Sequence, residues 1–421
     1  MRWDVIVAGA GAAGLLAAIR AAERGRRSLL LEKNRKPGAK ILMSGGTRCN
    51  ITHNTDARGI VAAYGHQGRF LHSALAALSP ADVVALFEAE GVATKVEDTG
   101  KIFPASDRAT DVLAALLRRL DRSGCELRLG EPLVEFSKTN NAFQLVTPDS
   151  EYEATAVIIT TGGQSYPGCG TTGDAYRWLA ELGHTIVPPR PALTPITTNA
   201  TWVTSLKGVT IPDVLLRVVV GERASIPGGT PQAKKKKTLD ERRGSFLFTH
   251  FGLSGPVALD VSRTITGHPA PMSLDLECDF LPARSAGEIE ADLASEAASD
   301  GKRQLLGMLS RFVPRRLAEA LLDKAGVSVE LKAAELSKRL RRQLVDAIKR
   351  TRIPISGTRG FKKAEVTAGG VTLREVDSST MESKLVTNLF LAGEVLDLDG
   401  PIGGYNFQAA FSTAWLAGLN V

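Results

Sequence analysis

The sequence predicts an α/β protein in which the two ends of the chain together build one Rossmann-like nucleotide-binding domain. A glycine-rich turn, GAGAAG at Gly9–Gly14, directly follows a short apolar run, and a second strand-like run followed by a glycine-rich loop lies near the C-terminus. Between them the pattern changes to short β-type runs and then to helices. We therefore expect a first nucleotide-binding segment at 1–190, an inserted β-barrel-like domain at 191–284, an inserted helical subdomain at 285–350 and a second nucleotide-binding segment at 351–421.

Composition places the chain among soluble globular enzymes. It has 421 residues, 43% hydrophobic and 23% charged, which is enough for more than one core. No apolar run reaches the roughly 18 residues that span a bilayer, and the N-terminus lacks a secretory cleavage pattern. Four cysteines without paired spacing favour a reducing compartment. We expect a cytoplasmic protein with no membrane partner.

The net charge of +7 has two readings. The basic run Lys234–Lys237 and the segment Lys338–Arg352 could be solvated faces that attract small anions, or a nucleic-acid surface. Aromatic residues, which stack on bases, make up only 5% of the chain and do not interleave with these clusters. This favours the first reading, and we expect no nucleic-acid partner.

The first glycine motif has the context that a dinucleotide site requires. The apolar run Asp4–Ala8 reads as a buried parallel strand and leads directly into the glycines. Gly9 allows the tight turn, Gly11 lets a pyrophosphate approach the backbone, and Gly14 permits close packing of a helix on the strand. The predicted helix, Ala12–Arg24, presents its N-terminus to the phosphates.

A carboxylate selects the nucleotide. Gly25 ends the helix, and a second buried strand, Ser28–Leu31, leads to Glu32. At this position a carboxylate accepts the ribose hydroxyls and repels a 2′-phosphate, so the ligand is FAD or NAD rather than NADP.

A second match, GCGTTG at Gly168–Gly173, lacks that context. A loop, TGGQSYP, separates it from the predicted strand Ala156–Thr160, no acid closes a second strand, and Arg190 lies among prolines that suit an inter-domain crossing. We therefore predict one nucleotide. The ligand-binding positions of this region are those that cap the strand, namely Thr161, Gly162 and Gly163.

The C-terminal segment favours FAD over NAD. Another strand, Asn388–Ala392, leads into Gly393 and Glu394, then into the loop VLDLDGPIGG and a helix from about Tyr405. FAD is longer than NAD, and its ribityl chain and ring need a separate acid and a separate helix end. We predict FAD as the cofactor.

Several stretches resemble the bacterial FAD-dependent oxidoreductase family that includes aminoacetone oxidase and the BaiN-type bile-acid reductases. They are the N-terminal motif, KILMSGGTRCNITHN, TTGGQSYPGCGTTGD, LFTHFGLSGP, VTAGGV and LAGEVLDLDGPIGGYNFQAAFSTA, and they cover the chain from end to end. The resemblance implies a glutathione-reductase-type FAD-binding domain.

The resemblance also implies roles for individual residues. Glu394 would bind the ribityl chain, the Ser44–Asn50 loop would lie along the ribityl and isoalloxazine, Thr161 and Gly162 would lie near the adenosine, and Gly403–Phe407 would lie beside the pyrimidine edge. The complete predicted cofactor-binding set is Gly9, Ala10, Gly11, Ala12, Ala13, Gly14, Glu32, Lys33, Lys40, Ser44, Gly45, Arg48, Cys49, Asn50, Val134, Thr161, Gly162, Gly163, Gly393, Glu394, Gly403, Gly404, Asn406 and Phe407.

This chain departs from the family pattern at two places. Thr47 stands where a glycine is expected in SGGGRCN, and Pro401-Ile402 stands where a Tyr-Thr or Pro-Thr pair is common. The first departure could tighten the flavin loop, and the second could alter substrate access. Neither removes a cofactor-binding group.

Few side chains are candidates for acid–base chemistry. His250, in FTHFGLSGP, could exchange a proton with a substrate beside flavin N5, or could be a structural histidine at a domain junction. His53 has the same two readings, and Tyr166 and Tyr405 are possible phenol donors.

Two further kinds of chemistry are disfavoured. Cys49 and Cys169 lie in loops expected near the cofactor, but they lack the close spacing of a working dithiol. No Cys/His cluster has metal-ligand spacing, so we expect no metal.

The inserted region is expected to set substrate specificity. Pro227–Lys237 reads as a hairpin tip, and the apolar stripe Leu336, Leu340, Leu344 and Ile348 reads as core packing of a basic helix. We predict an FAD-dependent oxidoreductase that acts on a small organic substrate by hydride transfer at flavin N5, with O2 or a transiently bound NAD(P)H as the second redox partner. The alternatives are an FAD-dependent tRNA-modifying enzyme and a non-catalytic flavin-binding sensor.

Overall fold

The computed structural model describes residues 2–139, 141–221 and 238–421. The chain forms two compact units, Met1–Pro191 with Phe361–Val421, and Ala192–Gly360. We call them the first unit and the inserted unit. The basic run Lys234–Lys237 and the predicted hairpin tip Pro227–Lys237 lie outside the described residues.

The first unit is built on a seven-stranded sheet with the order β6-β2-β1-β9-β8-β7, to which β19 adds by pairing with β9. The strands β1, β2, β6, β9 and β19 pair in parallel, whereas β7 and β8 join antiparallel. The bounds are β1 (Arg2–Ala8), β2 (Ser28–Glu32), β6 (Glu126–Leu129), β7 (Glu135–Lys138), β8 (Phe143–Val146), β9 (Glu151–Ile159) and β19 (Leu389–Leu391). The parallel pairing of β1 with both β2 and β9 confirms the Rossmann-like prediction.

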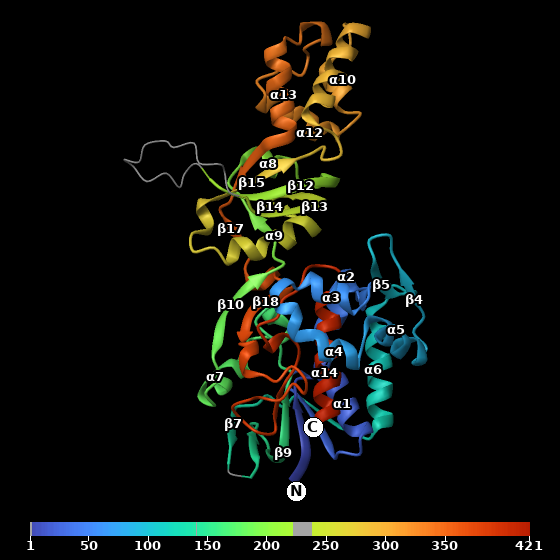
Figure 1. Ribbon diagram of the computed structural model, residues 1–421, viewed down its shortest axis with the longest axis vertical. Coiled ribbons are helices and arrows are strands. Elements are labelled where there is room, and N and C mark those ends of the chain that lie inside the picture. The colour runs from blue at the N-terminus through green and yellow to red at the C-terminus, as the bar shows by residue number, and fades with distance from the viewer. Residues whose placement is uncertain (1, 140, 222–237) are drawn as a thin grey trace, which may run out of the picture. The chain divides into compact units, whose positions relative to one another are not determined.

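Helices α1 (Ala12–Glu23) and α14 (Tyr405–Asn420) join the two chain segments into this one unit (Figure 1). A Cβ on Gly418 would lie 2.6 Å from the carbonyl oxygen of Ala17, so the absent side chain lets the two helices approach closely. Nine α1 residues are buried, since this helix packs between the sheet, α14 and α6 (Ala109–Ser123). The predicted helix starts at Ala12 and near Tyr405 are confirmed.

The first unit contains further elements besides this sheet and these helices. They include two small sheets, β3-β5-β4 and β10-β18. Their bounds and those of the helices are α2 (Ala39–Thr47), β3 (Thr52–His53), α3 (Ala57–Ala63), α4 (His72–Ala77), α5 (Pro80–Ala89), β4 (Thr94–Val96), β5 (Lys101–Pro104), α7 (Asp174–Glu181), β10 (Ile186–Ala192) and β18 (Val366–Val371).

The inserted unit combines an antiparallel sheet with a helical part. Its seven strands have the order β16-β15-β12-β13-β14-β11-β17. The strands are β11 (Ile196–Thr197), β12 (Thr210–Val220), β13 (Thr238–Thr249), β14 (Gly252–Ser254), β15 (Leu274–Asp279), β16 (Thr351–Pro354) and β17 (Gly357–Thr358). The helices are α8 (Thr201–Ser205), α9 (Pro256–Thr266), α10 (Ala286–Ser299), α11 (Leu305–Leu309), α12 (Arg315–Lys324) and α13 (Lys338–Arg350).

Residues 351–360 differ from the sequence-based division, which assigned them to the second nucleotide-binding segment. They form β16 and β17, which pair with β15 and β11 of the inserted sheet. The short runs carry no sequence signal that says which sheet they join, because the partner strands lie far away in the chain. On α13 the predicted apolar stripe does pack into the core: Leu344 and Ile348 are fully buried, and Leu340 packs against them.

Among the described residues, no single helix is long and apolar enough to cross a membrane. A bent pair, Gly65–Ala77 with Pro80–Ala89, reaches the required length and apolarity only when its two pieces are counted together. Its large apolar side chains, such as Leu75 and Phe87, are buried in the protein core.

Candidate cofactor-binding site

The GAGAAG turn has the geometry of a phosphate cradle. Gly9 has φ +100°, and a Cβ on Gly14 would lie 1.7 Å from the Gly9 carbonyl oxygen, so neither position admits a side chain. A Cβ on Gly11 would meet nothing within 4 Å, which leaves open space at the N-cap of α1. Helix N-termini bind anions through their unpaired N–H groups, so this space fits a pyrophosphate.

The acid at the end of β2 lies beside this turn. Glu32 is buried, with 8% of its surface exposed, and the Ala10 N–H donates to its Oε2 at 2.7 Å. The Asn34 N–H donates to Oε1 at 2.9 Å. The carboxylate is therefore fixed against the glycine turn, the position that the ribose hydroxyls of a dinucleotide would reach.

Two buried polar atoms without a hydrogen-bond partner in the part of the chain that the structure describes belong to residues of the predicted cofactor-binding set. Asn50 Oδ1 and Thr161 Oγ1 are buried and have no hydrogen-bond partner within the described ranges. Unpaired buried polar atoms are rare in proteins, because each costs about 1–3 kcal/mol. Both residues belong to the predicted cofactor-binding set, and polar groups of FAD would satisfy them. The residues present therefore fit this cofactor.

The second glycine-rich segment meets the first turn directly. Gly393 has φ +77°, and a Cβ there would lie 2.8 Å from Cβ of Ala13 in α1. This contact places Glu394 beside the start of α1. The two ends of the chain thus contribute to one site.

Glu394 is held by a network that the sequence did not predict. Lys40 Nζ donates to Glu394 Oε2 at 2.6 Å and to Ser165 Oγ at 2.7 Å. Ser165 Oγ donates to Glu394 Oε1 at 2.6 Å, and the Thr367 N–H donates to the same atom at 3.0 Å. A Cβ on Gly163 would lie 3.0 Å from Oε1, so this glycine makes room for the carboxylate. Ser165 and Thr367 lie in the motifs TTGGQSYP and VTAGGV, but nothing in those motifs indicates which acid they contact.

The Ser44–Asn50 loop contains a run of left-handed backbone. Gly45, Gly46 and Thr47 have φ +56°, +67° and +70°. Thr47 thus adopts the conformation for which the family pattern supplies glycine, and this conformation is strained in a β-branched residue. Ser44 Oγ donates to the carbonyl oxygen of Ile41, which anchors the start of the loop.

The end of this loop is charged on one side and buried on the other. Arg48 donates to Glu97 at 2.6 Å and lies over the Phe103 ring, 4.0 Å from its centroid. Its guanidinium is therefore already engaged by an acid and an aromatic ring. Cys49 is fully buried, and burial raises the pKa of its thiol to about 12, so the thiol form dominates at neutral pH.

The N-terminus of α14 carries the predicted positions Gly403, Gly404, Asn406 and Phe407. Gly403 and Gly404 have φ +128° and +94°, and Gly404 is the N-cap of the helix. Asn406 closes the preceding loop by exchanging hydrogen bonds with Gly400. Phe407 packs beneath the first turn against Phe411, with the ring centroids 5.8 Å apart.

Two further predicted positions are Lys33, directly after β2, and Val134, before β7. Lys33 donates to Thr172 at 2.7 Å and forms an ion pair with Asp174 at 2.5 Å, which joins β2 to the GCGTTG loop. That loop packs against the end of β2 and does not follow a strand of its own, as predicted. Val134 precedes β7 and is 44% exposed.

His250 lies in the inserted unit, in the exposed turn between β13 and β14, with its ring 5.0 Å from that of Phe251. Its assignment as the acid–base group stays a prediction. No group of three or more His, Cys, Asp or Glu side chains within the described ranges could hold a metal ion.

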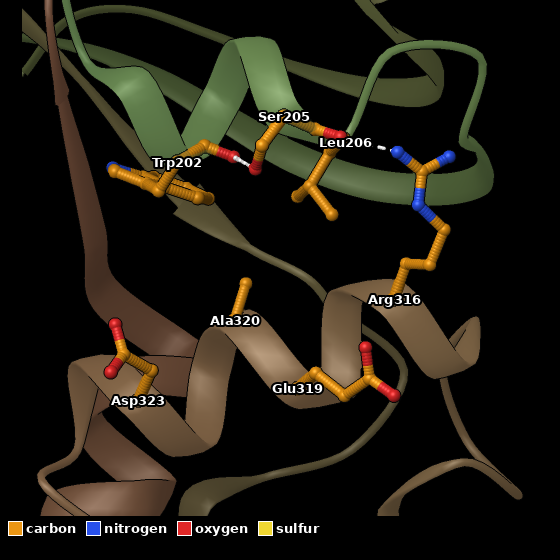
Figure 2. A pocket seen from close by; sticks show the side chains of 7 residues that line it. All are labelled: Trp202, Ser205, Leu206, Arg316, Glu319, Ala320 and Asp323. Atoms are coloured by element: carbon orange, nitrogen blue, oxygen red, sulfur yellow. Dashed lines mark hydrogen bonds between the residues drawn. The ribbon is translucent and has the colours of Figure 1, made fainter.

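The inserted unit also carries a hollow of about 280 Å³ between α8 and α12 (Figure 2). It is lined by Trp202, Ser205, Leu206, Arg316, Glu319, Ala320 and Asp323. Arg316 donates to the carbonyl oxygens of Ser205 and Lys207, and Glu319 pairs with Arg315. The side chains of Arg316 and Glu319 are thus already engaged within the protein, and we assign the hollow no ligand.

The parallel sheet, the glycine turn with its acid and the second glycine-rich segment define the class of FAD-dependent oxidoreductases. A family model described as the HI0933-like protein Rossmann domain matches residues 3–420, and the chain belongs to that family.

Three relatives match nearly the whole chain. It is 32% identical to the ribosomal RNA dihydrouridine synthase of Escherichia coli (strain K12), over 98% of this chain and 96% of the relative. It is 32% identical to the protein of the same name from Haemophilus influenzae, over 99% and 98%. It is 29% identical to the 3-dehydro-bile acid delta(4,6)-reductase of Clostridium scindens, over 98% and 97%.

Proposed function

We propose that this chain is an FAD-dependent reductase that saturates a carbon–carbon double bond conjugated to a carbonyl group, with NAD(P)H as the electron donor. One observation carries the proposal: the names of three full-length relatives describe this one reaction on two unrelated skeletons. Dihydrouridine is uridine with its C5–C6 bond saturated, and that bond is conjugated to the C4 carbonyl. The Δ4,6 bonds of a 3-oxo bile acid are conjugated to the C3 carbonyl in the same way.

The reaction adds a hydride to the carbon β to the carbonyl and a proton to the α carbon. FAD, when bound, supplies the hydride at N5. The chain's own residues bind and orient: the open N-cap at Gly11 receives the pyrophosphate, and Glu32 faces the ribose. Glu394, oriented by Lys40 and Ser165, receives the ribityl hydroxyls.

A uridine in ribosomal RNA is the first candidate substrate. Two relatives of that name match this chain over at least 96% of their own length, and the net charge of +7 suits a polyanion. From composition we expected no nucleic-acid partner and kept an FAD-dependent tRNA-modifying enzyme as an alternative. These two relatives favour an RNA substrate, and their names specify ribosomal RNA.

Helix α13 supports the RNA candidate. Its first turn contains Lys338 and Arg339, both exposed, and no acidic residue. Cations at a helix N-terminus oppose the helix dipole, at a cost of about 0.3–1 kcal/mol each, unless an anion lies nearby. Phosphate groups of RNA would supply that anion. Further along the helix, Lys349 pairs with Asp279 at 2.6 Å, so its charge is already compensated.

A small conjugated enone is the second candidate, because the bile-acid reductase relative acts on one according to its name. It agrees with the small organic substrate expected from the sequence. On this alternative the exposed cations of α13 have no part in substrate binding.

The test examines the electron donor and the electron acceptor in two separate steps. Purified FAD-loaded protein is mixed anaerobically with NADH or NADPH, and bleaching of the flavin is followed. The reduced protein then receives either ribosomal RNA from an E. coli strain that lacks its synthase or a 3-oxo-Δ4,6 steroid acid. Dihydrouridine in the digested RNA, or the saturated steroid, is measured by mass spectrometry.

We expect dihydrouridine to form, and to decrease in the Lys338→Glu, Arg339→Glu variant and with added salt. That variant should reduce a steroid as well as the wild type does. Reoxidation by O2 alone, with neither acceptor turned over, would contradict the proposed reaction.

A further inference from the structure

The first turn of α14 is held in place by a histidine from β3. His53 Nδ1 lies 3.0 Å from the carbonyl oxygen of Gly403, and its ring stacks on Tyr405 with centroids 4.6 Å apart and planes 22° apart. A Cβ on Gly100 would lie 2.6 Å from His53 Nε2, so the hairpin between β4 and β5 closes on the opposite edge of the ring. The imidazole is thus fixed on its face and on two edges.

This contact determines the histidine tautomer. The Gly403 oxygen can only accept a hydrogen bond, so Nδ1 must carry the hydrogen and donate. The neighbouring strand residue reinforces the arrangement, because a Cβ on Gly404 would lie 2.4 Å from the carbonyl oxygen of Thr52. Strand β3 therefore packs directly against the N-cap of α14.

The contact also determines the direction of a main-chain donor. In a trans peptide the C=O and the following N–H point in opposite directions. With the Gly403 oxygen directed to His53, the Gly404 N–H points away from the histidine. As the N-cap residue, Gly404 has an N–H that the helix itself leaves unpaired.

A buried acceptor lies three residues before the histidine. Asn50 is 9% exposed, and its Oδ1 has no partner among the residues that the structure describes. The pyrimidine edge of a flavin presents the complementary pattern, a carbonyl acceptor at C2 beside an N–H donor at N3. The Gly404 N–H is a donor and Asn50 Oδ1 is an acceptor, so the two groups are of the kinds that this edge requires.

We infer that His53 is a positioning residue, which fixes the Gly403–Gly404 peptide so that the Gly404 N–H donates to the flavin C2 oxygen. This inference rests on the proposed function and on the pyrimidine edge of the flavin lying beside Gly403–Phe407, as the family resemblance implies. Negative charge at this edge grows when the flavin is reduced, and a fixed donor stabilises the reduced form more than the oxidised form. By fixing this donor, His53 raises the reduction potential of the bound flavin.

Two substitutions separate the hydrogen bond from the ring. His53→Phe keeps a ring that stacks on Tyr405 but has no donor, whereas His53→Asn keeps an N–H donor at about the position of Nδ1 and loses the stack. His72→Phe is the matched control, because His72 is an exposed histidine of the same unit. For each protein we measure the FAD dissociation constant and the flavin midpoint potential against a reference dye under anaerobic conditions.

We expect His53→Phe to bind FAD but to lower the ratio of reduced to oxidised flavin about tenfold at a given potential, a shift of about 30 mV to more negative values. His53→Asn should restore most of this shift, and His72→Phe should match the wild type. Equal potentials in all four proteins would overturn the inference. A loss of the same size in both His53 variants would also overturn it, because the effect would then come from the ring or its charge. Failure of the wild type to bind FAD would instead refute the proposed function.

Discussion

Thr47 offers a direct test of backbone strain in the flavin loop. It is exposed, has φ +70°, and stands where the family pattern has glycine. A non-glycine residue in this left-handed region costs about 1–2 kcal/mol. Glycine removes that strain, but it also increases the entropy of the unfolded chain, which costs about 0.4–1 kcal/mol. Thr47→Gly should therefore stabilise the protein by about 0.5–1 kcal/mol.

The matched variant is Thr47→Ala. Both substitutions remove the hydroxyl, which donates only to the neighbouring Gly46 carbonyl oxygen, but alanine keeps the Cβ that causes the strain. The difference between the two variants therefore measures the cost of the Cβ in this conformation. Urea unfolding followed by circular dichroism should place the Thr47→Gly midpoint about 0.2–0.5 M above that of Thr47→Ala, with the same slope. A Thr47→Gly midpoint at or below the Thr47→Ala midpoint would refute the reasoning.

Three further predictions concern the glycine turn, the thiols and acid stability. Gly11→Val should purify without flavin, because its side chain enters open space, and it should melt at the same temperature as wild-type protein stripped of flavin. Gly14→Ala should melt below flavin-free wild type, because its Cβ would lie 1.7 Å from a carbonyl oxygen. In the native protein iodoacetamide should label the partly exposed Cys169 at pH 8 before Cys49, because burial raises the pKa of the Cys49 thiol to about 12. Peptide mass spectrometry that found Cys49 labelled first would contradict this. Burial lowers the pKa of His184 below its usual value of about 6.5. The folded state therefore favours the neutral imidazole, and this contribution to the free energy of unfolding is fully present above about pH 6.5. It is lost as the pH falls through the lowered pKa. His184→Gln should flatten the dependence of the urea midpoint on pH below about 6.5, and a parallel dependence in the variant would count against this assignment.

The parts of the site that are contiguous in the chain follow from local sequence alone. The strand, glycine turn, helix and acid between Asp4 and Glu32 lie where the pattern predicted, because each depends on turn geometry and burial within a few residues. The strand and helix around Gly393 and Tyr405 follow for the same reason.

Which distant residues meet depends on how the strands and helices pack in space. Lys40 and Glu394 are separated by 354 positions, and each would be an ordinary surface charge if the strands were arranged differently. The contact of His53 with Gly403 likewise depends on β3 packing on the N-cap of α14. Local propensity acts over a few residues, whereas these pairs exist because the order of strands in a sheet brings the ends of separate segments to the same edge.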